Sequence, residues 1–315
     1  MSDPFPIIHS PMLATLIDAP FNDPHWLFET KWDGFRALCT IASNGSLRLL
    51  SRNGHDLLQR YPRLSTLRTS FHGTSLLLDG EIVALDRYGR SNFQRLQDAE
   101  RRNVALKYAV FDLLYARGRD LRERPLLERK ARLREVLTLD GPAIYSEYIV
   151  EKGKALFAKA KRRGLEGIVG KRSDSTYQER RSRDWVKIKA AFEQEFVICG
   201  WSDPEGSRLG FGALLLGAYE GARLRYVGDV GTGFSKSDLR KLHALLLQRT
   251  RKTRAIDELP ERTAGVHWVS PNLIAEVRFA QWTRDRRLRQ AVFLGLRDDK
   301  NPRDVALELP VPRAR

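Results

Sequence analysis

Cysteine is scarce in this chain of 315 residues. There are only two, Cys39 and Cys199, and each lies inside an apolar run that is typical of a strand. Two isolated thiols in such runs indicate buried cysteines in a reducing compartment, and they exclude a disulfide framework. No group of cysteines and histidines has the spacing of zinc ligands, so a zinc finger is excluded as well.

Long apolar runs are also missing. No segment approaches the length of about 20 apolar residues that a membrane-spanning helix needs. Residues 1–6 lack the charged and apolar regions of a signal peptide. We therefore expect a cytoplasmic protein without a membrane partner. The apolar fraction of 42% is that of an ordinary folded protein, so disorder is not expected.

Acidic residues are too few to balance the basic ones. The chain has 39 Asp and Glu against 55 Lys and Arg, which gives a formal net charge of +16. Such an imbalance indicates a polyanionic partner, most often nucleic acid. Charge alone also fits a protein that is merely basic.

Two common nucleotide-binding motifs are absent. Residues 165–171 end in Gly-Lys but lack the first glycine and the final Ser or Thr of a Walker A loop. Residues 228–233 are rich in glycine, but their order and their context do not match a dinucleotide-binding fingerprint. Neither stretch therefore supports a P-loop or a dinucleotide-binding site.

The pattern of strands and helices changes near residue 190, which predicts two domains, 1–192 and 193–315. In the first, we expect strands over 26–41, 46–51, 75–85, 104–114, 167–170 and 185–189, and helices near 56–69, 126–137 and 153–163. In the second, we expect strands over 194–201, 212–219, 224–230, 273–282 and 291–296, with a helix over 235–249. Five short strands and one helix predict a Greek-key barrel of the oligonucleotide-binding (OB) type, and an SH3-like barrel fits the same count.

Lys31 lies in the most informative stretch, Glu-Thr-Lys-Trp-Asp-Gly-Phe-Arg at residues 29–36. A lysine can act as a covalent nucleophile, but with an ordinary pKa of about 10.4 it is protonated and inert at neutral pH. It becomes reactive where nearby cations or a metal remove the proton. The alternative is an edge-strand lysine that pairs with Asp33.

Three carboxylates, those of Asp79, Glu81 and Glu166, stand beside glycine in otherwise apolar stretches. A buried carboxylate is costly unless it is paired or binds a metal. Each therefore either forms a salt bridge with an arginine or provides an oxygen ligand for Mg²⁺ bound to phosphates.

Other residues allow two interpretations each. Lys187 and Lys189 share one face of a strand, either as a clamp on a polyphosphate or as a solvated edge. Arg52 is either a phosphate or ribose contact or a turn residue. Phe111 either stacks on a ligand or belongs to the core.

Taken in order, these stretches resemble the nucleotidyltransferase motifs of covalent ligases and capping enzymes. The matching stretches are residues 31–36, 51–54, 78–81, 108–114, 165–169, 185–189 and 297–300. Further stretches resemble bacterial ATP-dependent DNA ligases of the ligase D type; they are residues 11–14, 171–175, 211–217 and 226–234. Arg180-Arg181-Ser182 departs from the Gly-Arg-Ser that is frequent in that group. The chain matches the ligase module alone, without the polymerase and phosphoesterase modules often fused to it.

The resemblance implies an α+β fold, in which an ATP-grasp-like nucleotidyltransferase domain of antiparallel sheets with helices precedes an OB-fold barrel. It implies ATP as the AMP donor, with Mg²⁺ or Mn²⁺. It assigns Lys31 as the nucleophile that forms lysyl-AMP. The implied nucleotide contacts are Glu29, Arg36, Arg52, Glu81, Phe111, Lys187, Lys189, Arg297 and Lys300, and the implied metal ligands are Glu81 and Glu166.

The implied partner is duplex DNA with nicks or ends, bound by a monomer, and a Ku-like end-binding protein is a further candidate. We expect the basic runs at 249–254 and 284–287 to follow the DNA backbone, and a hinge near 190–193 to permit rotation of the second domain. Two alternatives stay open, an RNA ligase or capping-type guanylyltransferase and a catalytically silent DNA-end-binding module. NAD⁺ is not the expected donor, because only thirty residues precede Lys31.

Overall fold

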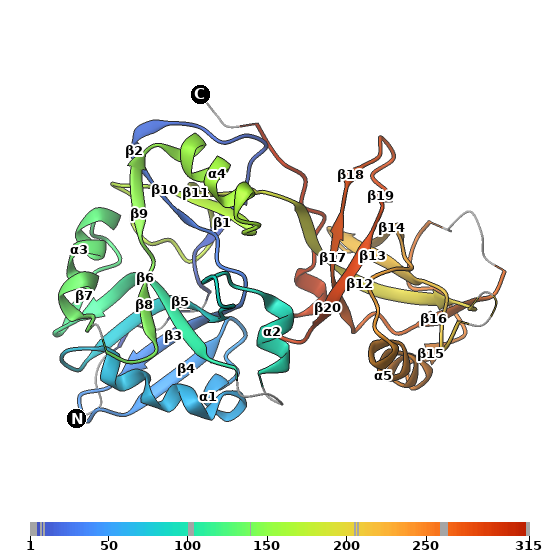
Figure 1. Ribbon diagram of the computed structural model, residues 1–315, viewed down its shortest axis with the longest axis horizontal. Helices are drawn as coiled ribbons and strands as arrows, with labels where there is room; N and C mark the ends of the chain where they lie inside the picture. The colour runs from blue at the N-terminus through green and yellow to red at the C-terminus, as the bar shows by residue number, and fades with distance from the viewer. Residues whose placement is uncertain are drawn as a thin grey trace. The chain divides into compact units, whose positions relative to one another are not determined.

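The computed structural model describes residues 5–6, 8, 10–99, 104–138, 140–204, 206, 208–258 and 264–312. The chain divides into two compact units (Figure 1). The first extends to Ala190 and also includes the segment that begins at Pro310, and the second is Ala191–Leu309. In the first unit, Val311 forms a parallel bridge to Ile17. The domain predicted over 193–315 included this C-terminal segment.

The first unit contains two sheets with helices. Its strands are β1 (Leu13–Leu16), β2 (Asp23–Thr30), β3 (Phe35–Ile41), β4 (Leu47–Ser51), β5 (Leu76–Ala84), β6 (Leu106–Ala116), β7 (Arg119–Asp120), β8 (Ala143–Tyr145), β9 (Tyr148–Glu151), β10 (Gly167–Arg172) and β11 (Arg181–Lys189). Its helices are α1 (Leu57–Arg60), the 3₁₀ helix η1 (Pro62–Ser70), α2 (Phe93–Asp98), α3 (Leu126–Val136) and α4 (Gly153–Arg162).

The two sheets are mostly antiparallel. One has the strand order β1-β11-β10-β2-β9, and the other has the order β4-β3-β5-β6-β7, with β8 beside β6. The parallel neighbours are β1 with β11 and β6 with β8. This arrangement confirms the predicted α+β class for the first unit.

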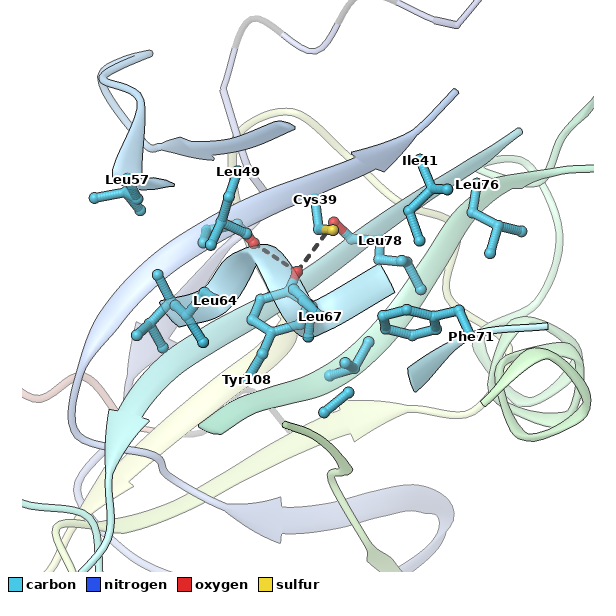
Figure 2. Close-up of a cluster of buried hydrophobic side chains, with 14 of the residues drawn as sticks. Cys39, Ile41, Leu49, Leu57, Leu64, Leu67, Phe71, Leu76, Leu78 and Tyr108 are labelled. Atoms are coloured by element: carbon cyan, nitrogen blue, oxygen red, sulfur yellow. Dashed lines mark hydrogen bonds between the residues drawn. The ribbon is translucent and has the colours of Figure 1, made fainter. Parts of the chain in front are cut away.

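A core lies between α1, η1 and one face of the second sheet, as Figure 2 shows. Alternate residues of each strand enter it, including Cys39 and Ile41 of β3, because side chains alternate between the faces of a sheet. The buried Tyr108 hydroxyl donates to the carbonyl oxygen of Ala37 at 2.9 Å and to that of Leu78 at 3.3 Å (Figure 2). The opposite face of these strands is left for a second cluster, which includes Phe111.

The predicted strand over 26–41 is wrong in one respect, because the chain leaves the extended conformation between Lys31 and Gly34. Here it crosses from β2 in the first sheet to β3 in the second. Gly34 is required at the crossing, since a Cβ there would lie 2.0 Å from the carbonyl oxygen of Ile82. Lys31 therefore stands at the junction between the sheets.

The helix predicted over 56–69 is also wrong in detail. The structure has a short α-helix that ends at Arg60, and then the 3₁₀ helix η1, which starts at Pro62. Proline cannot donate the backbone hydrogen bond that would continue the first helix.

The second unit is a small barrel. Its strands are β12 (Phe192–Ser202), β13 (Leu214–Glu220), β14 (Arg223–Val230), β15 (Thr250–Arg251), β16 (Val266–Val269), β17 (Ile274–Phe279), β18 (Gln281–Trp282), β19 (Leu288–Arg289) and β20 (Val292–Arg297). Its helices are α5 (Lys236–Leu247) and the 3₁₀ helix η2 (Pro302–Asp304).

The topology of the second unit is that of an OB fold. The strands β14-β13-β12-β17-β20 follow one another as antiparallel neighbours. Thr232, just after β14, forms a parallel bridge to Val292 of β20, so the curled sheet closes on itself. Helix α5, capped by Ser235, lies in the chain between the third and fourth barrel strands. The OB prediction is confirmed over the SH3-like alternative.

Among the helices of the described residues, none is long and apolar enough to cross a membrane.

Candidate active site

Lys31 lies at the end of β2 and is paired with a carboxylate. Its backbone N–H donates to the carbonyl oxygen of Gly167 at 3.0 Å, which aligns it with the start of β10. Its Nζ lies 2.5 Å from Oε1 of Glu166, and the side chains are 20% and 8% exposed. The partner of Lys31 is therefore Glu166. Asp33 instead accepts a hydrogen bond from the backbone N–H of Phe93, at the start of α2.

Carboxylates control the charge state of Lys31. Burial lowers its pKa, but the attraction and hydrogen bond of Glu166, with smaller effects of Glu81 and Asp33, raise the pKa well above its ordinary value. The expectation that neighbouring cations lower this pKa is wrong for this structure. The carboxylates therefore favour the protonated amine, and a lysine can attack an electrophile only after it has lost this proton.

The glycine of the Glu-Gly pair has a clear structural reason. Gly167 has a φ of +152°, and a Cβ there would lie 2.1 Å from the carbonyl oxygen of Ile188. A larger residue would push β10 away from β11. Gly167 therefore keeps Glu166 beside Lys31.

Lys187 and Lys189 lie on the same face of β11, as predicted. Lys187 pairs with Val169 and Lys189 with Gly167. Both lysines therefore lie beside β10, the strand that follows Glu166 in the chain. Both side chains are half-buried. Their placement puts two ammonium groups on the sheet face that also carries Glu29, because Val169 pairs with Glu29 as well.

Arg36 is fixed by Asp79, and Glu81 lies next to it. The guanidinium donates from Nε and Nη2 to the two oxygens of Asp79, at 2.5 and 2.6 Å. Asp79 is fully buried and also accepts from the Tyr177 hydroxyl at 2.7 Å. Of the two alternatives predicted for Asp79, a salt bridge with an arginine or a ligand for Mg²⁺, the structure shows the salt bridge. Glu81 pairs with Arg36 across β3 and β5 and is half-buried.

Phe111 is nearly buried, with 7% exposure. The Arg36 Cζ lies 4.6 Å from its ring centroid, and the Lys171 Nζ lies 4.3 Å from it. Trp185 meets the ring edge-on at 6.2 Å. Phe111 thus packs in the core cluster between the sheets, with two cations against its ring.

Glu29 belongs to a buried polar network that the sequence did not reveal. Its Oε1 accepts from Lys130 Nζ at 2.9 Å and from Lys171 Nζ at 3.1 Å, and its Oε2 accepts from the Ser146 hydroxyl at 2.8 Å. All four residues are at most 2% exposed. Charge-assisted hydrogen bonds of this kind are among the strong ones in proteins.

One signal for this network was present in the sequence. In α3, the apolar positions Leu126, Leu133 and Val136 face the core, and the same helical face includes residues 129 and 130. Arg129 and Lys130 are both fully buried there. Two cations on an apolar helix face predict buried acidic partners, and these are Asp112 for Arg129 and Glu29 for Lys130.

Arg52 lies in the turn after β4 and is half-buried. Ser51, the residue before it, pairs with Ala37, the residue after Arg36. The turn is closed by the backbone N–H of Gly54, which donates to the carbonyl oxygen of Ser51. Both predicted interpretations of Arg52 are compatible with this position.

Arg297 and Lys300, in the second unit, are held by carboxylates. Arg297 donates from Nε and Nη2 to both oxygens of Asp299 at 2.8 Å, and from Nη1 to Glu276 at 3.5 Å. Lys300 pairs with Glu195. Burial lowers the pKa of Arg297, but its acidic neighbours raise it well above the ordinary value, so the charge is permanent. An anionic ligand would compete with these carboxylates for the two cations.

The basic runs differ in how far their charges are engaged. In the run at 284–287, Arg286 pairs with Glu220 and Arg287 with Glu258, at 2.6 and 2.7 Å. In the run at 249–254, the contacts include those of Arg249 with a backbone carbonyl and of Arg251 with a hydroxyl. The positive charge of the run at 284–287 is therefore partly neutralised by carboxylates of the same chain.

Within the described part of the chain, no group of three or more His, Cys, Asp or Glu residues is arranged to hold a metal ion. The carboxylates of Glu81 and Glu166 both act on the same amine. Two carboxylates fit a hard cation that takes its remaining oxygens from phosphates and water, as Mg²⁺ does.

Lys171 should make a contribution to the free energy of unfolding that increases as pH rises. Burial, together with the charge of Lys130, lowers its pKa to about 8, against the attraction of Glu29 and Asp112. Between pH 8 and the ordinary lysine pKa of about 10.4, Lys171 binds more protons in the unfolded chain than in the native one, so its contribution to the free energy of unfolding rises with pH. Burial raises the pKa of Cys39 and Cys199, and these thiols contribute in the opposite direction. Thermal unfolding from pH 7.5 to 10 should therefore show a more negative pH slope of stability for Lys171→Met than for the native chain.

A matched control is Lys154→Met, which replaces an exposed lysine of α4. It should follow the native pH dependence. An identical slope for Lys171→Met and the native chain would contradict the lowered pKa.

Comparison with known proteins adds four findings. The family model described as the ATP dependent DNA ligase domain matches residues 11–189, and that of the ATP dependent DNA ligase C terminal region matches residues 207–300. The multifunctional non-homologous end joining protein LigD of Pseudomonas aeruginosa is 43% identical over 98% of this chain and 37% of its own length. The LigD protein of Mycobacterium tuberculosis is 40% identical over 95% of this chain and 40% of its own length. The chain thus spans about two fifths of these relatives.

Two solved structures are also similar. A mycobacterial DNA ligase D complexed with ATP and MES has a TM-score of 0.67 and 36% identity, over 94% of this chain and 97% of that one. The ligase domain of M. tuberculosis LigD has a TM-score of 0.52 and 37% identity, over 95% of this chain and 98% of that one.

Proposed function

Because this chain belongs to the ATP-dependent DNA ligase family, we propose that it seals breaks in duplex DNA through a lysyl-AMP intermediate at Lys31. The observation that carries the proposal is the place of Lys31, at the junction of the two sheets and 2.5 Å from Glu166. The resemblance deduced from the motifs is confirmed by the family match.

The first step forms lysyl-AMP from ATP. The deprotonated Nζ of Lys31 attacks the α-phosphorus, a phosphorus–nitrogen bond forms, and the bond to the bridging oxygen breaks as pyrophosphate leaves. Negative charge grows on the phosphate oxygens, and we assign its neutralisation to Lys187 and Lys189. Glu81 and Glu166 would hold Mg²⁺ or Mn²⁺, which supplies positive charge to the phosphates and competes with Lys31 for the carboxylates.

The nucleoside is bound by residues of both sheets. We assign Glu29 to a hydrogen bond with adenine and Phe111 to stacking on the adenine ring. Stacking requires that Arg36 or Lys171, which now lie against the Phe111 ring, move away from it. Glu81 would contact the ribose. Arg36 and Arg52 would contact the nucleotide or the 5′-phosphate of the DNA.

The later steps use DNA. AMP passes from Lys31 to a DNA 5′-phosphate, and the 3′-hydroxyl then attacks that phosphate while AMP leaves. Arg297 and Lys300 would orient the pyrophosphate in the first step only. We therefore propose residues 1–192 as the adenylation domain and the predicted domain 193–315 as an OB domain that is mobile as far as Leu309, with a hinge near 190–193.

The cellular role is proposed from the relatives. The two curated relatives are non-homologous end joining proteins, which supports a role in the repair of double-strand breaks. We propose that the chain acts as a monomer in the cytoplasm on nicks or ends of duplex DNA. Recruitment by a Ku-like protein is a further proposal. The net charge of +16 favours contact with the DNA backbone that weakens with salt.

A nick-sealing assay tests the proposal. The protein is incubated with Mg²⁺ and a nicked duplex of DNA or RNA, in the presence of ATP, GTP or NAD⁺. We expect sealing of DNA with ATP. Sealing of RNA alone would indicate an RNA ligase, transfer of label from GTP would indicate a guanylyltransferase, and DNA binding without label transfer would indicate a silent end-binding module.

A further inference from the structure

The direction of every hydrogen bond around Glu29 is fixed by its partners. Trp32 Nε1 can only donate, and it donates to the Ser146 hydroxyl oxygen at 3.0 Å. The Ser146 hydrogen is therefore free to point to Oε2 of Glu29, at 2.8 Å. Lys130 and Lys171 also only donate. Glu29 is thus an acceptor in all three contacts, which is the pattern of an ionised carboxylate.

The network also leaves one place on Glu29 for a further donor. A carboxylate accepts about four hydrogen bonds, two at each oxygen. The two lysines occupy Oε1, and Ser146 occupies one position of Oε2. Among the described residues, no fourth donor to Glu29 is found within hydrogen-bonding distance. The remaining position therefore lies on Oε2.

Lys130, like Ser146, lies outside every stretch that matches a motif. It comes from α3, is fully buried, and donates to both Glu29 and the backbone carbonyl oxygen of Ser146, each at 2.9 Å. It thus ties the carboxylate to the residue that holds its other oxygen. Tyr145, next to Ser146, lies with its ring centroid 4.5 Å from the Lys130 Nζ.

We propose that Lys130, Ser146 and Trp32 are positioning residues that hold Glu29 as an obligatory acceptor, so that the site selects a purine with a 6-amino group over one with a 6-oxo group. This inference rests on the proposed function, because it assumes that Glu29 faces the base of the nucleotide transferred to Lys31. The 6-amino group donates to Oε2. A 6-oxo group brings a second acceptor against it, and an unpaired buried polar group is costly.

Electrostatics supports the same view. Burial raises the pKa of Glu29, but the charges of Lys130 and Lys171, with the hydrogen bonds of Lys130 and Ser146, lower it below the ordinary value. Without Lys130, burial would dominate and the carboxyl would bind a proton more readily. A protonated Glu29 can donate to a 6-oxo group, so the discrimination between the two bases would fall as pH falls.

The experiment measures covalent labelling of Lys31 by ATP and by ITP. ITP carries a 6-oxo group where ATP carries the 6-amino group. The native chain should prefer ATP. Lys130→Met should lower the ATP-to-ITP ratio of kcat/KM by about tenfold or more, mainly through a higher KM for ATP and gained use of ITP. The ratio in the variant should fall further from pH 7 to pH 5.5, a range in which Lys171 keeps its charge, whereas the native ratio should be constant.

Two further variants separate positioning from simple structural damage. In the Glu29→Gln background, Lys130→Met should leave the ratio unchanged, because the residue acts through the carboxylate. Ser146→Ala removes one hydroxyl group and should lower the ratio even if Lys130→Met does not fold. Equal losses with ATP and ITP in either single variant, or an unchanged ratio in Ser146→Ala, would overturn the inference.

The outcome for the native chain separates this inference from the proposed function. If the native chain takes no label from any nucleotide, the proposed function fails. If it takes label from ATP and ITP equally well, the proposed function stands and the selection by Glu29 is refuted.

Discussion

Replacing Lys31 with arginine should reduce the transfer of label from α-labelled ATP to the protein to background. Arginine keeps a cation beside Glu166, so the ion pair at the junction of the sheets is preserved. Its guanidinium stays protonated at any accessible pH and cannot attack phosphorus. Lys31→Ala should have the same effect on labelling, but it also leaves the Glu166 carboxylate, 8% exposed, without its cation. The arginine variant therefore isolates the chemical role.

The measurement is mass spectrometry of the protein after incubation with ATP and Mg²⁺, which should show one added AMP in the native chain and none in the variant. Lys154→Ala, an exposed lysine of α4, is the matched control and should label normally. A Lys31→Arg protein that still gains AMP would refute the nucleophile assignment.

Arg297→Ala should slow the formation of lysyl-AMP by about a hundredfold while it slows the sealing of a pre-adenylated nick far less. The physical reason is that pyrophosphate is present only in the first step. The guanidinium is held in place by Asp299 and Glu276, so its loss removes a preorganised charge from the leaving group. Single-turnover rates of the two reactions measure the difference.

The second reaction is also the control for folding, because a damaged barrel would impair both steps. Arg223→Ala, which removes another arginine of the same barrel whose side chain is 85% exposed, should leave both rates near their native values. Equal losses in the two reactions for Arg297→Ala would count against its role with pyrophosphate.

The assignment of Lys31 as the candidate nucleophile came from the resemblance of motifs along the whole chain, because the local stretch alone also fits an edge-strand lysine. Lys31, Gly34 and Arg36 lie within six residues, and the requirement for glycine at the crossing is a property of the backbone there. The OB topology was also predictable, since five short strands and one capped helix leave few ways to close a small barrel. The strand prediction failed at the junction, where the chain passes from one sheet to the other, and it missed several strands, among them β1, β9 and β16.

The partners of these residues were not predictable in the same way. Glu29 meets Lys130, Ser146 and Lys171 across 101, 117 and 142 residues of chain. Such contacts depend on how two sheets and α3 pack, and periodicity within one element does not report on packing between elements. The sequence showed only that α3 carries cations on its apolar face.

The sequence by itself indicated the kind of chemistry, because its motifs, taken in order along the chain, resemble those of covalent nucleotidyltransferases. Only the tertiary structure decided the electrostatic surroundings of the groups that we propose to perform it. The pKa of Lys31 is raised because Glu166 lies beside it, and Glu29 is an acceptor because three donors surround it. A pKa is set by burial and by charges within a few ångströms, and these distances arise only when distant segments pack together.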